Sequence, residues 1–272
     1  MTFSLTVLGC NSAIPAYNRN LSAHLLNVNE RFFLIDCGEG TQFQLRKFHL
    51  SSRRISHILI SHLHGDHYFG LIGLLNSMHL LGRKEELHLF ADARLQEILD
   101  IQLQASMTSL NFPLVFHPLM LEQYHLIVEE EKYTIHSFPL RHSIPTCGFV
   151  FREKKPPRKI PAARSYAYCS DTVYDESITP FIQHVSLLYH EATFMQKMVA
   201  SAADKFHSTA MEAAGIAKKA EVGKLLLGHF SARYDDLNPL LGEARSIFPA
   251  SFLPEEGATL EIGNSLTKSN NN

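Results

Sequence analysis

The sequence predicts a mixed α/β fold, and two observations lead to this prediction. Short apolar stretches with the length and alternation of β-strands recur along the chain, and stretches with helical periodicity interrupt them. Histidines and carboxylates follow directly after several of the strand-like stretches, which is where sites mounted on a rigid sheet are usually built. We therefore expect a sheet-based protein whose chemistry lies at the ends of its strands.

The first part of the chain is expected to consist mostly of strands. Strand-like patterns cover residues 3–9, 23–28, 32–36, 57–61 and 87–90. The second and third of these are expected to pair as a hairpin across the polar residues Asn29 and Glu30. Leucine and isoleucine at mixed spacing predict a buried helix over 69–81, and a helical apolar stripe predicts another helix over 93–103.

The second part is expected to alternate between strands and helices. Several short strands are expected between 112 and 151, and further strands over 166–170, 185–189 and 225–228. Thr209 and Glu212 have the spacing of a capping box, which predicts a helix that runs to about Ala220. A chain of 272 residues fits one large domain better than two, so we expect a single domain over 1–264 and a polar tail over 265–272.

The composition limits the ways in which the chain can bind a polyanion. Its formal net charge is −2, so no global positive field attracts nucleic acid. A polyanionic partner must therefore be held by a local basic patch or by metal ions. The chain has 16 histidines and no tryptophan, which makes a metal site the first feature to look for.

The cysteines and the apolar stretches favour a cytoplasmic protein. The four cysteines form no CxxC pair and lie in or beside apolar runs, so buried free thiols are favoured over disulfides; they are Cys10, Cys37, Cys147 and Cys169. The chain does not open with a signal-peptide pattern, and no apolar stretch reaches the roughly 20 residues of a membrane span. We expect a cytoplasmic protein that has no membrane partner.

A histidine-rich turn follows the strand expected at 57–61. His62 and His64 form a His-x-His pair that can point two imidazoles at one cation, and Asp66 and His67 can reach a second cation after a glycine. Imidazole and carboxylate ligands together suit Zn²⁺, with Mn²⁺ or Fe²⁺ as alternatives. The competing interpretation is a solvated histidine-rich loop or a set of core histidines. The spacing between an apolar strand and a helix favours metal binding.

Two metal ions need more ligands than one turn supplies. His142, Asp171 and His229 each lie at the boundary of an apolar run, as the histidine-rich turn does. These residues are therefore the candidates for the remaining ligands. The shared placement is a pattern, and spacing alone does not show that the side chains meet.

Several longer motifs carry a family resemblance. They are Leu8-Gly9 with Pro15, Arg19 and Asn20, then Phe33 to Gly40, Ser61 to Leu71, His142 with Cys147 to Phe149, Tyr168 to Thr172, His190 to Thr193, His207 to Thr209 and Gly228 to Tyr234. Over nearly the whole chain the sequence resembles ribonuclease Z, the tRNA 3′-processing endoribonuclease branch of the metallo-β-lactamase superfamily. The His-x-His-x-Asp-His motif is shared by the superfamily. The late motifs are characteristic of the tRNA-processing branch.

The resemblance implies a fold, a cofactor and a set of roles. The implied fold is the metallo-β-lactamase αββα sandwich, and the implied cofactor is a pair of Zn²⁺ ions, with Mn²⁺ possible. One zinc would be held by His62, His64 and His142, the other by Asp66, His67 and His229, with Asp171 bridging them. Asp66 would also hold the attacking water as general base. His207, oriented by Glu191, would protonate the leaving ribose oxygen.

The resemblance also implies a substrate and a partner. The implied reaction removes the 3′ trailer of precursor tRNA and leaves a 3′-hydroxyl on the tRNA and a 5′-phosphate on the trailer. Arg19 and Asn20 lie in the loop that approaches the RNA in this family, although Tyr17 stands where the family usually has a basic residue. The family is commonly dimeric, so a homodimer is expected.

The chain departs from the family between His142 and Asp171. Ribonuclease Z proteins that have a tRNA-gripping arm insert it here, whereas this chain has a short stub over 152–164 with six basic residues and one glutamate. The stub can contact phosphates or can be an ordinary solvated loop. Two alternatives to tRNA processing stay open: a phosphodiesterase of the same fold that acts on small phosphate esters, and a metal-holding RNA-binding module without catalysis.

Overall fold

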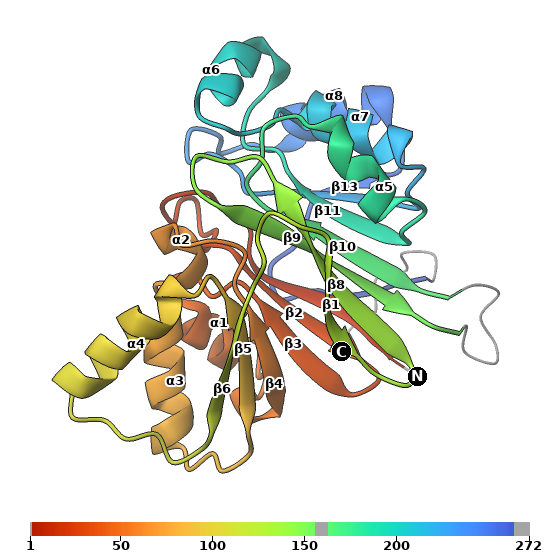
Figure 1. Ribbon diagram of the computed structural model, residues 1–272. Coiled ribbons are helices and arrows are strands. Elements are labelled where there is room, and N and C mark those ends of the chain that lie inside the picture. Colours follow the sequence, from red (N-terminus) through yellow and green to blue (C-terminus); the bar gives the residue numbers. More distant parts are fainter. Residues whose placement is uncertain (1, 156–162, 264–272) are drawn as a thin grey trace. The chain divides into compact units, whose positions relative to one another are not determined.

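The computed structural model describes residues 2–155 and 163–263 (Figure 1). The chain divides into two compact units, which are described separately. The first unit is Met1–Leu119 with Glu256–Thr259, and the second is Met120–Glu255 with Leu260–Asn272. The single domain expected over 1–264 stays a prediction, and the tail expected over 265–272 lies outside the described residues.

The first unit is built on a mixed seven-stranded sheet. In sheet order its strands are β14 (Thr259–Glu261, of which Thr259 alone belongs to this unit), β1 (Phe3–Gly9), β2 (Ala23–Val28), β3 (Arg31–Ile35), β4 (Ile55–Leu59), β5 (Leu87–Ala91) and β6 (Leu114–Pro118). The pairs β1–β2 and β2–β3 are antiparallel, and β3 to β6 are parallel. The predicted hairpin is confirmed, with Asn29 and Glu30 in its turn at positive φ. The strand expected at 57–61 begins and ends two residues earlier.

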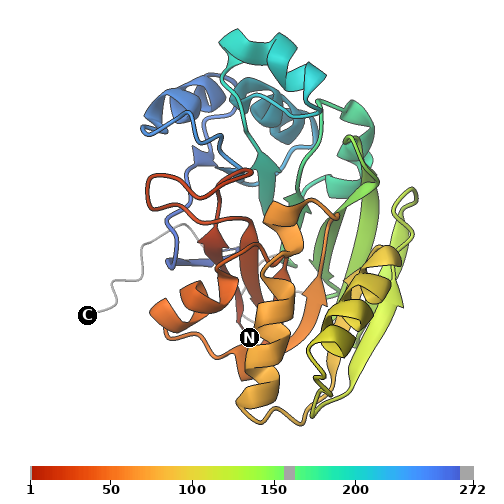
Figure 2. The ribbon, with the colours of Figure 1, turned by 90° about the vertical axis from the view of Figure 1, so that its left-hand side faces the viewer.

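Helices of the first unit cover one face of this sheet. They are α1 (Thr41–Lys47), α2 (Gly65–Tyr68), α3 (Leu71–Leu80) and α4 (Arg94–Ala105), with a 3₁₀ turn at Ser52–Arg54. Figure 2 shows the orange α3 and the yellow α4 lying over the strands. Buried leucines of α1, α3 and α4 share one apolar core with the sheet. The prediction of a buried helix over 69–81 is wrong at its ends, because Phe69, Leu80 and Leu81 are all exposed.

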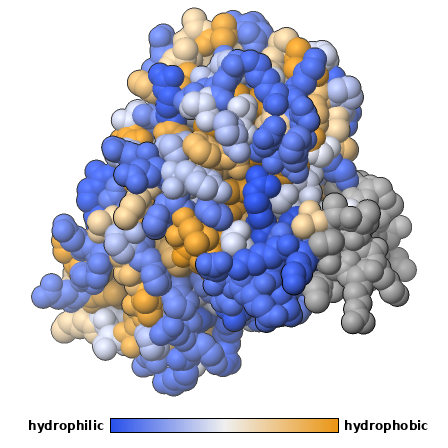
Figure 3. Space-filling view, turned by 45° about the vertical axis from the view of Figure 1, so that its right-hand side comes forward, coloured by the Kyte–Doolittle hydropathy of each residue, from blue (hydrophilic) through white to orange (hydrophobic). Residues whose placement is uncertain are grey.

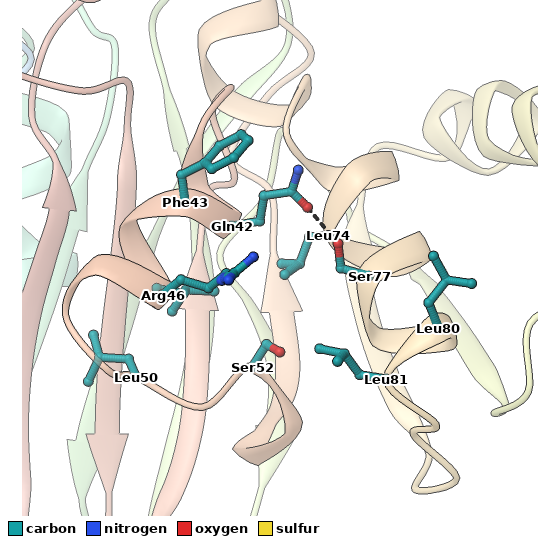
Figure 4. Close-up of a pocket in the computed structure, with 10 residues that line it drawn as sticks. Gln42, Phe43, Arg46, Leu50, Ser52, Leu74, Ser77, Leu80 and Leu81 are labelled. Carbon is teal, nitrogen blue, oxygen red and sulfur yellow. Dashed lines mark hydrogen bonds between the residues drawn. The ribbon is translucent and has the colours of Figure 1, made fainter.

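An apolar groove of about 510 Å³ lies between α1 and α3 (Figure 4). Phe43 on α1 is 68% exposed, and Leu80 and Leu81 at the end of α3 are 73% and 64% exposed. The hydroxyl of Ser77 donates to Oε1 of Gln42 at 2.7 Å and ties the two helices together. Elsewhere, the face drawn in Figure 3 carries mainly hydrophilic residues, with apolar ones in small groups.

The second unit is built on another mixed seven-stranded sheet. In sheet order its strands are β13 (Ser251–Phe252), β12 (Leu225–Gly228), β11 (Leu187–Glu191), β10 (Ser165–Cys169), β9 (Thr146–Glu153), β8 (Tyr133–Leu140) and β7 (His125–Glu129). From β7 to β10 neighbouring strands are antiparallel, and from β10 to β13 they are parallel. The short strands expected between 112 and 151 are therefore confirmed as β6 to β9. The strand expected at 185–189 lies two residues later.

The second unit contains the helix that the capping box at Thr209 and Glu212 predicts. Its helices are α5 (Thr179–Ile182), α6 (Val199–Asp204), α7 (Ala210–Lys219) and α8 (Asn238–Ile247), with 3₁₀ turns at Glu176–Ile178 and Gln196–Met198. The Thr209 hydroxyl accepts from the amide of Glu212, and the carboxylate of Glu212 accepts from the amide of Thr209 at 2.8 Å. The predicted capping box is thus confirmed.

The cysteines and the lengths of the helices also bear on the predictions from the sequence. All four cysteines are buried and form no disulfide, as predicted. Among residues 2–155 and 163–263, no helix has both the length and the apolar character needed to cross a membrane.

The residues at both ends of the predicted basic stub form hydrogen bonds and ion pairs within the second unit. The guanidinium of Arg164 is buried and donates to both carboxylate oxygens of Glu153, at 2.6 and 2.9 Å. Lys154 Nζ lies 2.8 Å from Glu129 Oε1, and Arg152 donates to the backbone carbonyls of Phe181 in α5 and of Gln183 just after it. Residues 156–162 of the stub lie outside the described residues. Arg164 and Arg152 therefore serve the packing of the sheet edge.

Candidate metal centre

In the first unit, the predicted ligands lie at the carboxyl edge of the parallel strands β3 and β4. Ile35 and Leu59 are paired at the ends of these strands, so the residues that follow them share one edge of the sheet. Asp36 comes directly after β3, and the histidine-rich turn begins just after β4. Close backbone packing holds the two loops together, since a Cβ on Gly70 would lie 2.2 Å from the carbonyl oxygen of Gly38.

Asp36 fixes the conformation of the histidine-rich turn through hydrogen bonds. Its fully buried carboxylate accepts hydrogen bonds from the amide and hydroxyl of Ser61 at 2.7 and 2.9 Å. The same carboxylate lies 2.7 Å from Nδ1 of His67. Asp36 has a φ of 56°, an uncommon conformation for a residue other than glycine. The strand end is therefore held in a strained conformation that aims the carboxylate at the turn.

The four predicted ligands of the turn form two pairs, and the ligand atoms of each pair lie close together. Nε2 of His62 lies 3.2 Å from Nδ1 of His64, so two ring nitrogens converge where a cation can be shared. Nε2 of His67 lies 3.5 Å from Oδ2 of Asp66. That carboxylate also accepts from the amide of Ala13 at 2.8 Å, which fixes its orientation.

In the second unit, four strands bring functional side chains to one edge of the sheet. Strands β10, β11 and β12 are parallel, and β8 runs in the same direction because each neighbour of β9 is antiparallel to it. Asp171 and His229 follow β10 and β12, His142 follows β8, and Glu191 is the last residue of β11. Sequence positions 87 residues apart are thereby placed at a common edge.

Asp171 lies between two predicted histidine ligands. Its Oδ2 lies 3.6 Å from Nε2 of His142, and its Oδ1 lies 3.1 Å from Nε2 of His229. All three side chains are at most 3% exposed. A carboxylate with each oxygen facing a different imidazole has the arrangement of a bridging ligand. Asp171 and His229, together with His207, also place ligand atoms within 4.8 Å of one another.

His207 and Glu191 form the predicted acid pair beside these ligands. Nδ1 of His207 lies 2.8 Å from Oε1 of Glu191, and the glutamate is fully buried. Burial raises the pKa of Glu191, but the charge and hydrogen bond of His207 outweigh it, so its pKa lies below the ordinary value. The His207 ring centroid lies 5.2 Å from that of His142 and 5.4 Å from that of His229.

The hydrogen bonds of the histidines fit a metal centre. In three of them Nδ1 faces a fixed oxygen: the carboxylate of Asp36 for His67, the carbonyl of Phe206 at 2.9 Å for His142, and the hydroxyl of Thr193 at 3.0 Å for His229. A proton on Nδ1 leaves Nε2 as the ligand atom, as in most protein sites with histidine-bound metals. The donor set of imidazoles and carboxylates matches Zn²⁺ and its neighbours.

Arg19 and Asn20, the predicted RNA-contacting residues, lie in a loop of the first unit. Both side chains form hydrogen bonds within that unit. Arg19 donates to Oδ1 of Asn11 at 3.0 Å, and its guanidinium lies over the ring of Tyr17. The amide and side chain of Asn20 donate to the carboxylate of Glu256 at 2.8 and 2.7 Å. Asn20 thus anchors the loop, and Arg19 lies near its tip, where Tyr17 is half exposed.

Sequence reasoning assigned no role to two residues that orient the ligands. Asp36 supports His67 and Ser61, and Thr193 lies 2.7 Å from Glu191 and 3.0 Å from His229. Both residues belong to motifs that carried the family resemblance. Each lies within two residues of the end of a buried strand, as the predicted ligands do, but this placement does not show which groups they contact.

Comparisons with known proteins agree with this geometry. A family model described as Anti-Pycsar protein Apyc1 matches residues 3–243. A ribonuclease Z of Cytophaga hutchinsonii is 41% identical, and the alignment covers 100% of both chains. This chain belongs to the ribonuclease Z family. It also belongs to the family described by the matching model.

Solved structures show the same fold. The human tRNase Z, short form (ELAC1), is 30% identical with a TM-score of 0.81, covering 95% of this chain and 99% of that one. The metallo-β-lactamase fold protein YhfI of Bacillus subtilis is 23% identical with a TM-score of 0.75, covering 96% of this chain and 100% of that one. The predicted metallo-β-lactamase fold class is confirmed. The chain is an enzyme of the ribonuclease Z type, which acts on phosphodiester bonds.

Proposed function

We propose that this chain removes the 3′ trailer of precursor tRNA, leaving a 3′-hydroxyl on the tRNA and a 5′-phosphate on the trailer. The observation that carries the proposal lies in the second unit. Asp171 faces His142 and His229 with its two oxygens, and the His207–Glu191 pair lies beside them. The names of the relatives, ribonuclease Z and tRNase Z, supply the substrate class.

We propose that the chain holds two Zn²⁺ ions, with Mn²⁺ able to replace them. His62, His64 and His142 would hold one ion, Asp66, His67 and His229 would hold the other, and Asp171 would contribute to both. The support is that each unit gathers its own share of these side chains at one sheet edge. When bound, a metal pair polarises the attacked phosphate and lowers the pKa of a water near it.

The protein groups then move two protons in this proposal. Asp66 accepts the proton of the attacking water through a carboxylate that Ala13 holds in place. His207 donates a proton from Nε2 to the leaving ribose oxygen, because its Nδ1 is engaged by Glu191. The buried negative charge of Glu191 stabilises the protonated imidazole that this step requires. Arg19 contacts the RNA backbone, and Asn20 holds the loop that carries it.

A cleavage assay tests the proposal. Zinc-loaded protein is incubated with 5′-labelled precursor tRNA, and the expected product has the length of mature tRNA and a free 3′-hydroxyl. Asp66→Ala is expected to abolish turnover while circular dichroism stays unchanged, because it removes the proposed base and a ligand. Full activity of this variant with an unchanged metal content would refute the assignment of Asp66. Absence of any mature-length product with the unmodified protein would overturn the proposed function.

A phosphodiesterase of the same fold is the second candidate, and one observation favours it. The alignment with the Cytophaga hutchinsonii relative extends over 312 positions, whereas this chain has 272 residues, so the relative contains residues that this chain lacks. Arg152, Lys154 and Arg164 of the short stub are also engaged with their own unit. This candidate predicts fast hydrolysis of a small chromogenic diester and no cleavage of precursor tRNA. A non-catalytic RNA-binding module predicts tRNA binding without cleavage.

A homodimer in the cytoplasm completes the proposal. The groove between α1 and α3 exposes three large apolar side chains in one unit, Phe43, Leu80 and Leu81 (Figure 4). Such a patch is typical of a surface that a protein partner covers. A second copy of this chain is the occupant that the family resemblance implies.

A further inference from the structure

A second cavity lies in the second unit beside the proposed ligand His142. It has a volume of about 430 Å³, within the range of roughly 300–1,000 Å³ that small-ligand pockets occupy. The end of β8 and the loop after it form one side, and Phe206, in the loop between α6 and α7, forms another. Its walls are mixed: the apolar part includes Leu121 and Leu140, which are buried, and Ile144, which is half-buried.

Phe206 connects this cavity to the proposed centre. Its backbone carbonyl accepts the hydrogen bond from Nδ1 of His142 at 2.9 Å, and the next residue is His207. The residue is 42% exposed, although it is a large apolar side chain at the edge of a buried polar site. Its φ is 56°, so the backbone conformation that supports His142 is an uncommon one. Folding alone gives no reason for an exposed aromatic ring at this position.

Charges around the cavity restrict what it can hold. Glu122 lines it and opposes a phosphate group inside. Arg141, at the rim, is 68% exposed on its side chain and only loosely paired with Asp175 at 3.9 Å. A phosphate is therefore favoured at the side that Arg141 and His142 line, and a flat uncharged group is favoured in the rest of the cavity. Nucleobases are such groups, and they stack on exposed aromatic rings with little regard to sequence.

We propose that this cavity binds the nucleobase of a nucleotide that flanks the scissile phosphate, with Phe206 as its stacking partner. The inference rests on the proposed function, because it takes His142 as part of the centre that acts on that phosphate. It adds a substrate-binding residue that is neither a metal ligand nor a proton carrier. Stacking on one ring makes the site tolerant of base identity and intolerant of a missing base.

The variant Phe206→Ala isolates the ring from the rest of the site. The hydrogen bond to His142 uses the backbone carbonyl, so it does not depend on the side chain. Alanine and phenylalanine both carry a Cβ, so the strain of the positive φ is the same in both. Phe206→Tyr keeps the ring, and Ile101→Ala removes another exposed apolar side chain, on α4 of the first unit, as a surface control. Zinc content is measured for every variant.

Two measurements test the proposal on the zinc-loaded protein. The first is kcat/KM for precursor tRNA with an intact base, with an abasic discriminator position, or with an abasic first trailer position. For the unmodified protein, one of the two abasic substrates is expected to have a kcat/KM lower by on the order of 10-fold than the intact substrate. On the intact substrate, Phe206→Ala is expected to have a similarly lowered kcat/KM. The two changes together are expected to cause less than about a twofold further loss, since both remove the same contact.

The second measurement needs no cleavage. A short RNA with a non-hydrolysable central linkage is titrated with or without the flanking base, and binding is followed by fluorescence anisotropy. The unmodified protein, Phe206→Tyr and Ile101→Ala are expected to prefer the RNA with the base by on the order of 10-fold, and Phe206→Ala is expected to show no preference. Equal binding of both RNAs by the unmodified protein would overturn the inference. Absence of tRNA cleavage with a preserved base preference would overturn only the proposed function.

Discussion

Asp36 is not among the proposed metal ligands, yet its carboxylate contacts three groups, the amide and hydroxyl of Ser61 and the ring of His67. Its carboxylate fixes the start of the turn through Ser61 and the ring of His67 through Nδ1. Thr193 has the corresponding position in the second unit, between Glu191 and His229. Residues of this kind set which imidazole nitrogen faces the metal, and they restrict the rotation of the ring.

Asp36→Asn is expected to weaken Zn²⁺ binding on the order of 10- to 100-fold, because an amide supports the imidazole of His67 less well than a carboxylate does. Competition with a chromophoric chelator measures the affinity. The matched control is Asp100→Asn, which changes an exposed carboxylate on α4. An affinity equal to that of the unmodified protein would show that Asp36 has only a structural role.

At the scale of single elements, the sequence was most informative where a pattern is local. The hairpin at Asn29 and Glu30 and the capping box at Thr209 were predictable because each depends on residues close in the chain. Strand β4 ends at Leu59, two residues before the predicted end at Ser61, whose amide bonds to Asp36 instead of a neighbouring strand. That contact joins residues 25 positions apart, which periodicity cannot show.

The short helix α1 was missed for a related reason. Only three of its seven residues are buried, so its apolar pattern is too weak to distinguish it from a loop; the three are Thr41, Gln44 and Leu45. The candidate site was predictable as a list of residues, since each ligand follows a strand. Its orienting groups were not predictable, because their contacts arise only when several strand ends share one sheet edge.

Strand β4 also makes the first unit sensitive to acid. His57 is buried against the rings of Phe33 and His88, and burial, together with the nearby His88, Arg31 and His117, lowers its pKa from 6.5 to about 3. The folded state therefore binds this proton less readily than the unfolded state does. The free energy of unfolding is fully retained above about pH 6.5 and falls as pH decreases toward 3, by up to about 1.4 kcal/mol per pH unit.

His57→Phe is expected to reduce this acid sensitivity while keeping the ring packing. Between pH 7.5 and pH 5, the unmodified protein is expected to lose up to roughly 2 kcal/mol more stability than the variant. Urea unfolding at the two pH values provides the comparison. An identical loss in both proteins would show that His57 does not contribute to the pH dependence.

The buried ion pair at the end of β9 provides a second prediction at this scale. Arg164→Ala leaves the buried carboxylate of Glu153 without its guanidinium, so a loss of about 3–5 kcal/mol in unfolding free energy is expected. Lys154→Ala breaks a pair whose two side chains are 33% and 60% exposed, and less than about 1 kcal/mol is expected. Urea unfolding of both variants measures the difference. Equal losses would contradict the structural role given to Arg164.

At the scale of the whole molecule, the groove between α1 and α3 is the surface assigned to self-association. Phe43→Glu places a charge among the exposed apolar side chains of the groove and is expected to shift the protein from dimer to monomer in analytical ultracentrifugation. Met107→Glu is the control, since Met107 is 93% exposed and does not line the groove. A dimer that persists in Phe43→Glu would place the interface elsewhere.

The proposed function depends on seven side chains that share one pair of metal ions. Crystals of the zinc-loaded protein, measured at the zinc absorption edge, locate the ions directly. Two anomalous peaks about 3.5–4 Å apart are expected. Asp171 is expected between the peaks, with His62, His64 and His142 at one ion and Asp66, His67 and His229 at the other. A single peak, or two peaks without Asp171 between them, would contradict this assignment.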